Sequence, residues 1–138
     1  MAAKLTNKGQ EYLLHGTATP NGGLTNLATA VRLYDNTSVP NKNGSGFVQV
    51  ASGNGYPVGG TLITRASWAL ALNLGDQRIT LADIVLTASG GNIPNIAGAY
   101  FVDAGGLVLA WWERGSSLTL GPGETLTLDD LSVKLIDA

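Results

Sequence analysis

The chain of 138 residues contains no cysteine, which excludes disulfide bonds and thiolate metal ligands. It has a single histidine, His15, and only 13% charged residues, about half the usual share of roughly 25%. A net charge of −2 leaves no basic surface to neutralise a phosphate backbone, so we expect no nucleic-acid partner. No apolar run is long enough to span a bilayer, and the first residues lack the apolar core of a signal peptide. We therefore expect a chain made in the cytoplasm, with no membrane partner.

Hydrophobic residues make up 44% of the chain, enough for one packed domain over residues 1–138. Residues 5–14 place apolar side chains at helical spacing and Gly16 would end that helix, so residues 1–26 are predicted to form an N-terminal helix and loop arm. The rest alternates in short segments between Gly, Pro and Asn turns, which predicts an all-β sandwich or barrel. A phase slip around Asp129-Asp130 in the last alternating stretch predicts a β-bulge or tight bend there. The expected strands are residues 28–34, 47–50, 61–64, 67–72, 78–87, 97–102, 107–112, 117–120 and 126–135.

The strand expected between Gly105 and Gly115 has no polar side chain on either face over residues 107–112. Strict alternation puts Leu107, Leu109 and Trp111 on one face and leaves Val108, Ala110 and Trp112 on the other. A strand with one face in water would alternate apolar with polar, so both faces are expected to be covered, by the chain itself or by another subunit. Trp111 is predicted to lie in the core and Trp112 to contact a partner. The candidate interface residues are Trp112, Ala110, Val108, Tyr34 and Tyr12.

The residues that could support catalysis or metal binding are few. His15 falls at the end of the expected helix, where a helix-end role is favoured over that of a base. Asp129-Asp130 is the only adjacent acid pair, and a solvated bend is favoured over a calcium site. The glycines of residues 53–55 and 121–123 lack the Lys-Ser/Thr of a phosphate loop. We therefore expect no enzymatic activity, no metal and no cofactor.

The paired tryptophans leave one binding alternative open. Trp111 and Trp112 precede Glu113 and Arg114, and an aromatic face beside polar groups is typical of sugar-binding sites. Val108 and Ala110 are apolar neighbours, which favours a subunit interface because Trp is enriched there. A carbohydrate-binding module remains the alternative.

Several motifs follow one another in an order that resembles a known group of proteins. They are Leu5-Thr6-Asn7-Lys8-Gly9 to Leu14, Arg32-Leu33-Tyr34-Asp35, Gly55-Tyr56 with Trp68, Phe101-Val102-Asp103-Ala104-Gly105-Gly106 to Trp111, and Gly121-Pro122-Gly123-Glu124-Thr125. Taken together they resemble bacteriophage tail-fibre-like and capsid decoration (cement) proteins, over nearly the whole chain. The resemblance implies a jelly-roll-like antiparallel β-sandwich with a short N-terminal helix. It implies no catalytic residues.

The resemblance also sets the functional expectation. It implies a virion structural protein on the capsid exterior, a homo-oligomer that is often a trimer, with the major capsid protein as partner. Residues 78–99 lack the tryptophan turn often seen in this group. No additional receptor-binding domain is expected, which favours a capsid-bound protein over a host-recognising fibre. A tail-fibre or baseplate adaptor is the first alternative.

Overall fold

Antiparallel strands dominate the computed structural model, which describes residues 3–6, 28–73 and 76–136. Within those residues the only helix is a 3-10 turn, η1 (Arg65–Ser67). The all-β antiparallel prediction is therefore confirmed. The strands are β1 (Lys4–Leu5), β2 (Ala30–Asp35), β3 (Thr61–Leu62), β4 (Trp68–Asn73), β5 (Asp76–Leu81), β6 (Ile84–Thr87), β7 (Ile93–Val102), β8 (Val108–Leu120), β9 (Thr125–Leu128) and β10 (Ser132–Ile136).

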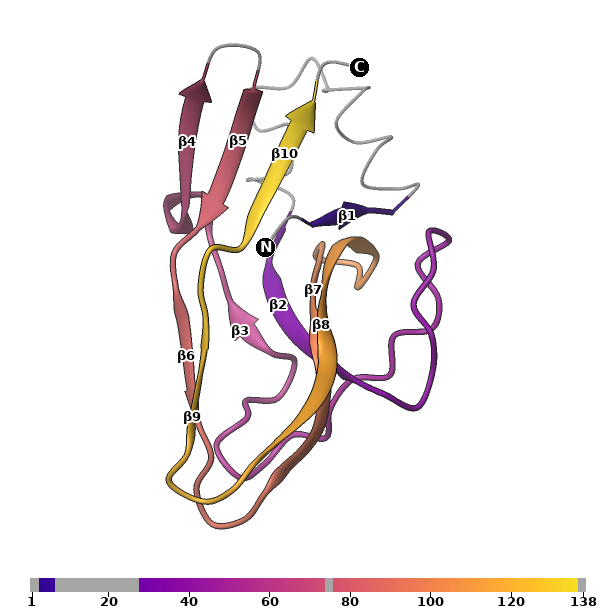
Figure 1. Cartoon of the computed structure of the whole chain (residues 1–138), viewed down its shortest axis with the longest axis vertical. Helices are drawn as coiled ribbons and strands as arrows, with labels where there is room; N and C mark the ends of the chain where they lie inside the picture. Colours follow the sequence, from indigo (N-terminus) through magenta and orange to yellow (C-terminus); the bar gives the residue numbers. More distant parts are fainter. Residues whose placement is uncertain (1–2, 7–27, 74–75, 137–138) are drawn as a thin grey trace.

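The strands form two facing layers (Figure 1). One layer is a five-stranded sheet in the order β1-β8-β7-β2-β3. The other consists of a three-stranded sheet, β10-β5-β4, and a two-stranded sheet, β6-β9. In Figure 1 the β6-β9 pair continues β5 and β10 downward, so these two sheets together face the five-stranded one.

The second layer is one long ladder with a break in its middle. Thr80 pairs with Ser132 above the break and Ile84 pairs with Leu128 below it, so equal lengths of chain separate the pairs and the register is unchanged. Leu81 and Ile84 are both buried although three residues apart, which means that the strand exchanges its faces at the break. On the opposite strand the same exchange of faces occurs at Asp130, whose backbone is left-handed with a φ of 50°. The change of phase predicted around Asp129-Asp130 is confirmed, and it is produced by this left-handed residue and not by a β-bulge.

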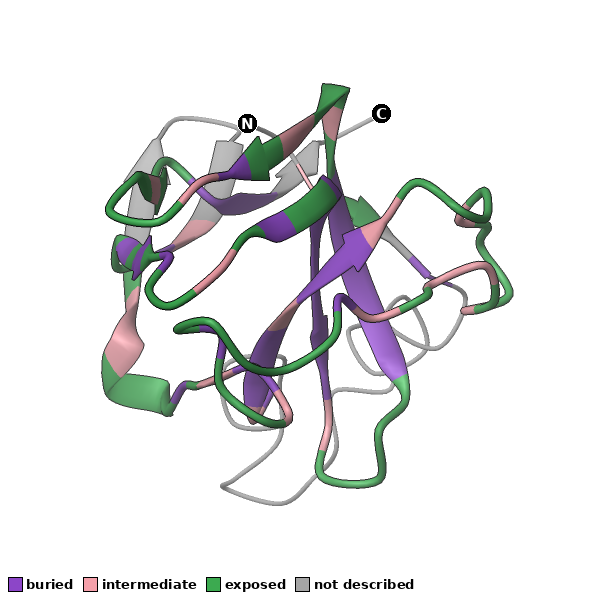
Figure 2. Cartoon of the chain, turned by 90° about the horizontal axis from the view of Figure 1, so that it is seen from below, coloured by how far each residue is buried: buried purple, intermediate pink, exposed green. Residues whose placement is uncertain are grey.

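The main core lies between the layers, and the buried residues follow the central strands while the loops are exposed (Figure 2). Trp112 and Phe101 are its largest fully buried side chains, with ring centroids 5.3 Å apart. Trp68 packs edge-on against Phe101 at 5.5 Å. The inward placement predicted for Leu81, Ile84 and Leu86 is confirmed, and so is that of Leu131 and Val133, all of them buried.

Some element predictions differ from the structure. The segments expected at 107–112 and 117–120 are one strand of 13 residues, β8. The strand expected from 97 starts at Ile93 in β7, and residues 47–50 form only an isolated bridge, between Gln49 and Tyr34. Lys4 and Leu5 are in β1, where Leu5 was expected to begin a helix. The remainder of that helix, with Tyr12 and His15, lies outside the described residues.

Candidate functional site

A β-bulge in β8 decides which tryptophan faces which layer. Phe101 pairs with Ala110 but Val102 pairs with Val108, so Leu109 is an extra residue on the β8 side. Leu109 and Ala110 consequently both belong to the main core, and every residue after them is shifted to the opposite face. The prediction that Trp111 lies in the main core and Trp112 outside it is wrong for this reason.

Both tryptophans are buried within the chain. Trp112 is 1% exposed in the main core, and Trp111 is 4% exposed in a second cluster on the outer face of the five-stranded sheet. The other interface candidates are also buried, with Val108 9%, Ala110 0% and Tyr34 2% exposed. None of these side chains forms an exposed face of the single chain, and neither tryptophan can serve as a sugar platform. Tyr12 lies outside the described residues.

The second cluster, which we call the outer aromatic cluster, consists of Ala30, Tyr34, Tyr100, Val102, Val108 and Trp111. Phe47, from the loop that follows β2, packs on it. Its ring centroid lies 5.5 Å from Tyr34, 5.0 Å from Tyr100 and 5.6 Å from Trp111. Edge-on and tilted contacts at these distances are the favourable geometries for aromatic pairs. The chain thus supplies a cover for the second apolar face of β8 itself, where the sequence left open another subunit.

The Tyr34 side chain reaches from β2 across Gly98 of β7 to β8. It is paired with Gly98 of β7, and its hydroxyl donates to the carbonyl oxygen of Trp112 on β8 at 3.3 Å. A Cβ at position 98 would lie 2.2 Å from that oxygen and 2.5 Å from the Tyr34 hydroxyl, so only glycine fits. Burial, with the charge of Glu113 as the smaller cause, raises the pKa of Tyr34 to about 12. The hydroxyl is therefore a fixed hydrogen-bond donor and not a group that ionises near neutral pH.

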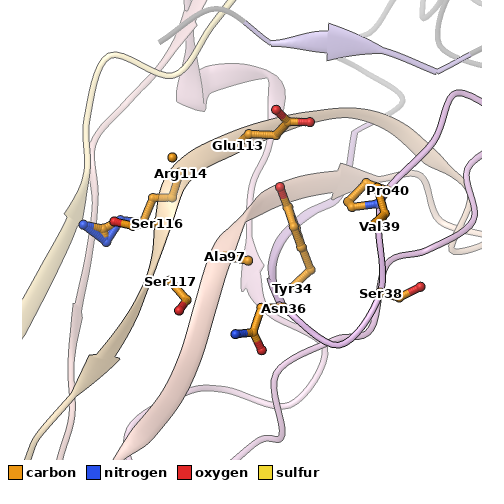
Figure 3. A pocket seen from close by; sticks show the side chains of 11 residues that line it. Tyr34, Asn36, Ser38, Val39, Pro40, Ala97, Glu113, Arg114, Ser116 and Ser117 are labelled. Carbon is orange, nitrogen blue, oxygen red and sulfur yellow. The ribbon is translucent and has the colours of Figure 1, made fainter.

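A wider bulge opens beside Tyr34. Gly98 pairs with Glu113 and Ile96 pairs with Leu118, so Ala97 alone lies opposite residues 114–117 of β8. The displaced strand forms one wall of a groove of about 460 Å³, which we call the bulge groove. Its other walls are Ala97, Tyr34 near the end of β2, Asn36 just after that strand, and the loop of residues 38–40 (Figure 3). Bulges are over-represented next to functional sites because they redirect side chains.

Glu113 is held in place at the upper rim of this groove. One carboxylate oxygen accepts a hydrogen bond from Nζ of Lys4 at 2.9 Å, and the other accepts one from Nε1 of Trp111 at 3.2 Å. These two bonds, that of Lys4 first, hold the pKa of Glu113 below its usual value. Each oxygen keeps a further lone pair free to accept from a ligand.

The neighbouring Arg114 points elsewhere. Figure 3 shows its side chain directed away from Tyr34, and it lines a small cavity of about 20 Å³ with Leu126 and Leu128. Among the described residues, its Nη1 atom is buried and has no hydrogen-bond partner. The Arg114 guanidinium therefore does not place a positive charge beside Tyr34 in the bulge groove.

A second surface feature lies at an open edge between the layers. Thr61, Leu62 and Ile63 of the β3 region and Ile84 and Val85 of β6 line a groove of about 290 Å³, which we call the edge groove. Leu62 is 83% and Val85 61% exposed. Among the described strands β6 (Ile84–Thr87) pairs with β9 alone, and its four residues include neither the charge nor the proline that exposed edge strands normally carry.

Within the described ranges, no group of three or more His, Asp or Glu side chains lies close enough to hold a metal ion. Nor does any helix in the described part of the chain have the length and hydropathy to cross a membrane. Comparison with known protein families, with curated proteins and with solved structures finds no match to this chain.

Sequence reasoning named Tyr34, Glu113 and Arg114 but did not predict the bulge that brings them into one groove. It also gave no role to Gly98, which lies under the Tyr34 hydroxyl, and it assigned Phe47 to a strand and not to the cover of the outer aromatic cluster. The signal for the groove was the run Gly115-Ser116-Ser117, which is small and polar in the middle of what proves to be one strand. Such a run in a strand indicates a bulge or a close approach of backbone.

Proposed function

We propose that this protein is a structural protein of a bacteriophage virion, and specifically a capsid decoration protein that binds the outer shell as a homo-oligomer. The jelly-roll-like topology and the N-terminal helix belong to the same proposal. The observation that carries it is the edge groove, where Leu62 and Val85 stand exposed on two different layers. The partner we assign to this edge is the major capsid protein.

The energetics favour a partner at this edge. Complete burial of a Leu or Val side chain contributes about 1.5–3 kcal/mol, and the edge groove leaves one of each in water. Among the described residues that line this groove, Asp83 is the only charged one, so little charge has to be desolvated on contact. A modest contact of this kind is sufficient on a shell, because many linked copies act together.

The low charge supports the same assignment. Only 13% of the residues are charged. An isolated soluble domain normally carries a larger share of charged residues, which keep it monomeric. Both apolar faces of β8 are covered within the chain, so we assign the assembly contact to the edge groove, where Leu62 and Val85 are exposed beside a single charged residue among the described lining.

The test uses particles of the phage that encodes the chain. Wild-type protein is expected to co-sediment with tail-free capsids, and Leu62→Asp or Val85→Asp should reduce the bound copies at least tenfold. Val58→Asp is the matched control, because Val58 is 87% exposed and does not line the edge groove. Sedimentation with purified tails and not with capsids would assign the protein to a tail adaptor and overturn the proposal.

The mass of the purified protein in solution tests the oligomer separately. A trimer or another closed oligomer supports the proposal. A monomer that also fails to bind capsids refutes it.

A further inference from the structure

We propose that the bulge groove binds a neutral oligosaccharide, with Glu113 and Asn36 as its hydrogen-bonding residues and Val39-Pro40 as its apolar wall. This inference does not depend on the capsid assignment, because the bulge groove and the edge groove share no residue.

The size and origin of the groove favour a ligand. Its volume of about 460 Å³ falls within the range of about 300–1,000 Å³ found for small-molecule sites. It exists because four residues of β8 lie opposite the single residue Ala97, which is the largest of the three irregularities in the β7–β8 ladder. The floor is rigid, since Tyr34 is 2% exposed and bonded across Gly98 to the carbonyl oxygen of Trp112.

The polar groups of the groove match the hydroxyls of a sugar. Glu113 presents a carboxylate that two hydrogen bonds hold in one orientation, and Asn36 lies at the opposite end of the Tyr34 ring (Figure 3). Ser38 and Ser117 add hydroxyl groups, which both donate and accept. Carboxylates, amides and hydroxyls fixed by a scaffold provide the complementary donors and acceptors that a polyhydroxylated ligand requires.

The apolar wall supplies a surface for the C–H face of a sugar ring. Val39 and Pro40 lie across the Tyr34 side chain from Ser116 and Ser117 (Figure 3). Val39 is 83% exposed, an unusual state for a β-branched aliphatic side chain beside a cavity. Covering it with a pyranose ring would remove apolar area from water on both partners.

The charge balance selects a neutral ligand. Glu113 is the only acidic residue in the described lining of the groove, and Lys4 pairs with it at 2.9 Å. The one basic residue of the lining, Arg114, directs its side chain away from Tyr34. A phosphorylated or sulfated ligand would therefore meet no free cation.

The experiment measures binding of the wild-type protein to a printed array of neutral glycans, and by NMR titration to maltohexaose, cellohexaose and chitohexaose. At least one neutral glycan is expected to bind. The groove variants are Asn36→Ala, Glu113→Gln and Val39→Ser, each expected to weaken binding about threefold to tenfold through a lost hydrogen bond or apolar contact.

Matched controls make the same chemical changes outside the groove, in Asn92→Ala, Glu124→Gln and Val58→Ser, and should leave affinity unchanged. Wild-type protein that binds no neutral glycan overturns the inference, as does equal binding by the groove and control variants. Stronger binding of a heparin hexasaccharide than of every neutral glycan also overturns it. Because the groove variants leave Leu62 and Val85 intact, they should bind capsids normally, so the two proposals fail independently.

Discussion

Gly98→Ala is the most demanding test of how the five-stranded sheet is held together. The added Cβ would lie 2.2 Å from the carbonyl oxygen of Trp112 and 2.6 Å from the ring carbon Cζ of Tyr34. Ordinary contact begins at 3.4 Å, so the strands would have to separate by about 1 Å at this position. Overpacking of this kind costs typically 1–3 kcal/mol, and the rigid backbone partner places this case at about 3 kcal/mol.

Urea denaturation, followed by tryptophan fluorescence and circular dichroism, measures this loss. Gly115→Ala is the matched control, because nothing lies within 4 Å of its added Cβ and its stability should change by no more than about 1 kcal/mol. Tyr34→Leu should not rescue Gly98→Ala, since the nearest atom is the backbone oxygen and not the phenol ring. A Gly98→Ala protein within 1 kcal/mol of wild type would refute the close approach of Tyr34 and β8 on either side of Gly98.

Three further predictions concern the outer aromatic cluster and its rim. Phe47→Ala should lower the free energy of unfolding by about 2 kcal/mol and shift the tryptophan emission to the red, because it removes three ring contacts; unchanged emission would contradict the packing. Folding lowers the pKa of Glu113, so its ionised carboxylate stabilises the fold at pH values above the usual pKa of 4.5. This contribution is lost as the pH falls through the pKa that Glu113 has in the folded protein. Wild type should therefore be more stable than Glu113→Gln at pH 7, and the difference should shrink below pH 4.5 in denaturation series. Tyr34 has a pKa of about 12 against a usual 10.0, so its contribution is present below pH 10 and is lost as the pH rises toward 12. Tyr34→Phe should accordingly show a smaller alkaline loss of stability, measured by the same series.

The sequence predicted β6 of the second layer well because this strand has one face in the core and one in water. The burial pattern of β6 alternates strictly, with Ile84 and Leu86 inside and Val85 outside. The change of phase near Asp130 was also visible, since an inward leucine is followed three residues later by another. Alternation is informative wherever the two faces differ in polarity.

The five-stranded sheet was harder to predict because β8 is apolar on both faces. The position of the bulge at Leu109 depends on its partners Phe101 and Val102, which lie on another strand. Strict alternation therefore assigned Val108 and Leu109 to their observed faces and misplaced the residues from Ala110 onward. The bulge groove was missed for the same reason, because a bulge is a property of paired strands and not of one.

The first described residues connect both layers. Lys4 and Leu5 pair with β8, and the Thr6 amide donates to the carbonyl oxygen of Leu109 at 2.9 Å. Ala3 donates to the carbonyl oxygen of Ser132 on β10 at 2.9 Å. A ribosome makes these residues more than 100 positions before their partners, which at about 5–20 residues per second is a wait on the order of ten seconds. During synthesis the β1–β8 pairing can therefore form only after β8 has been made, and the Ala3 hydrogen bond only after Ser132 has been made.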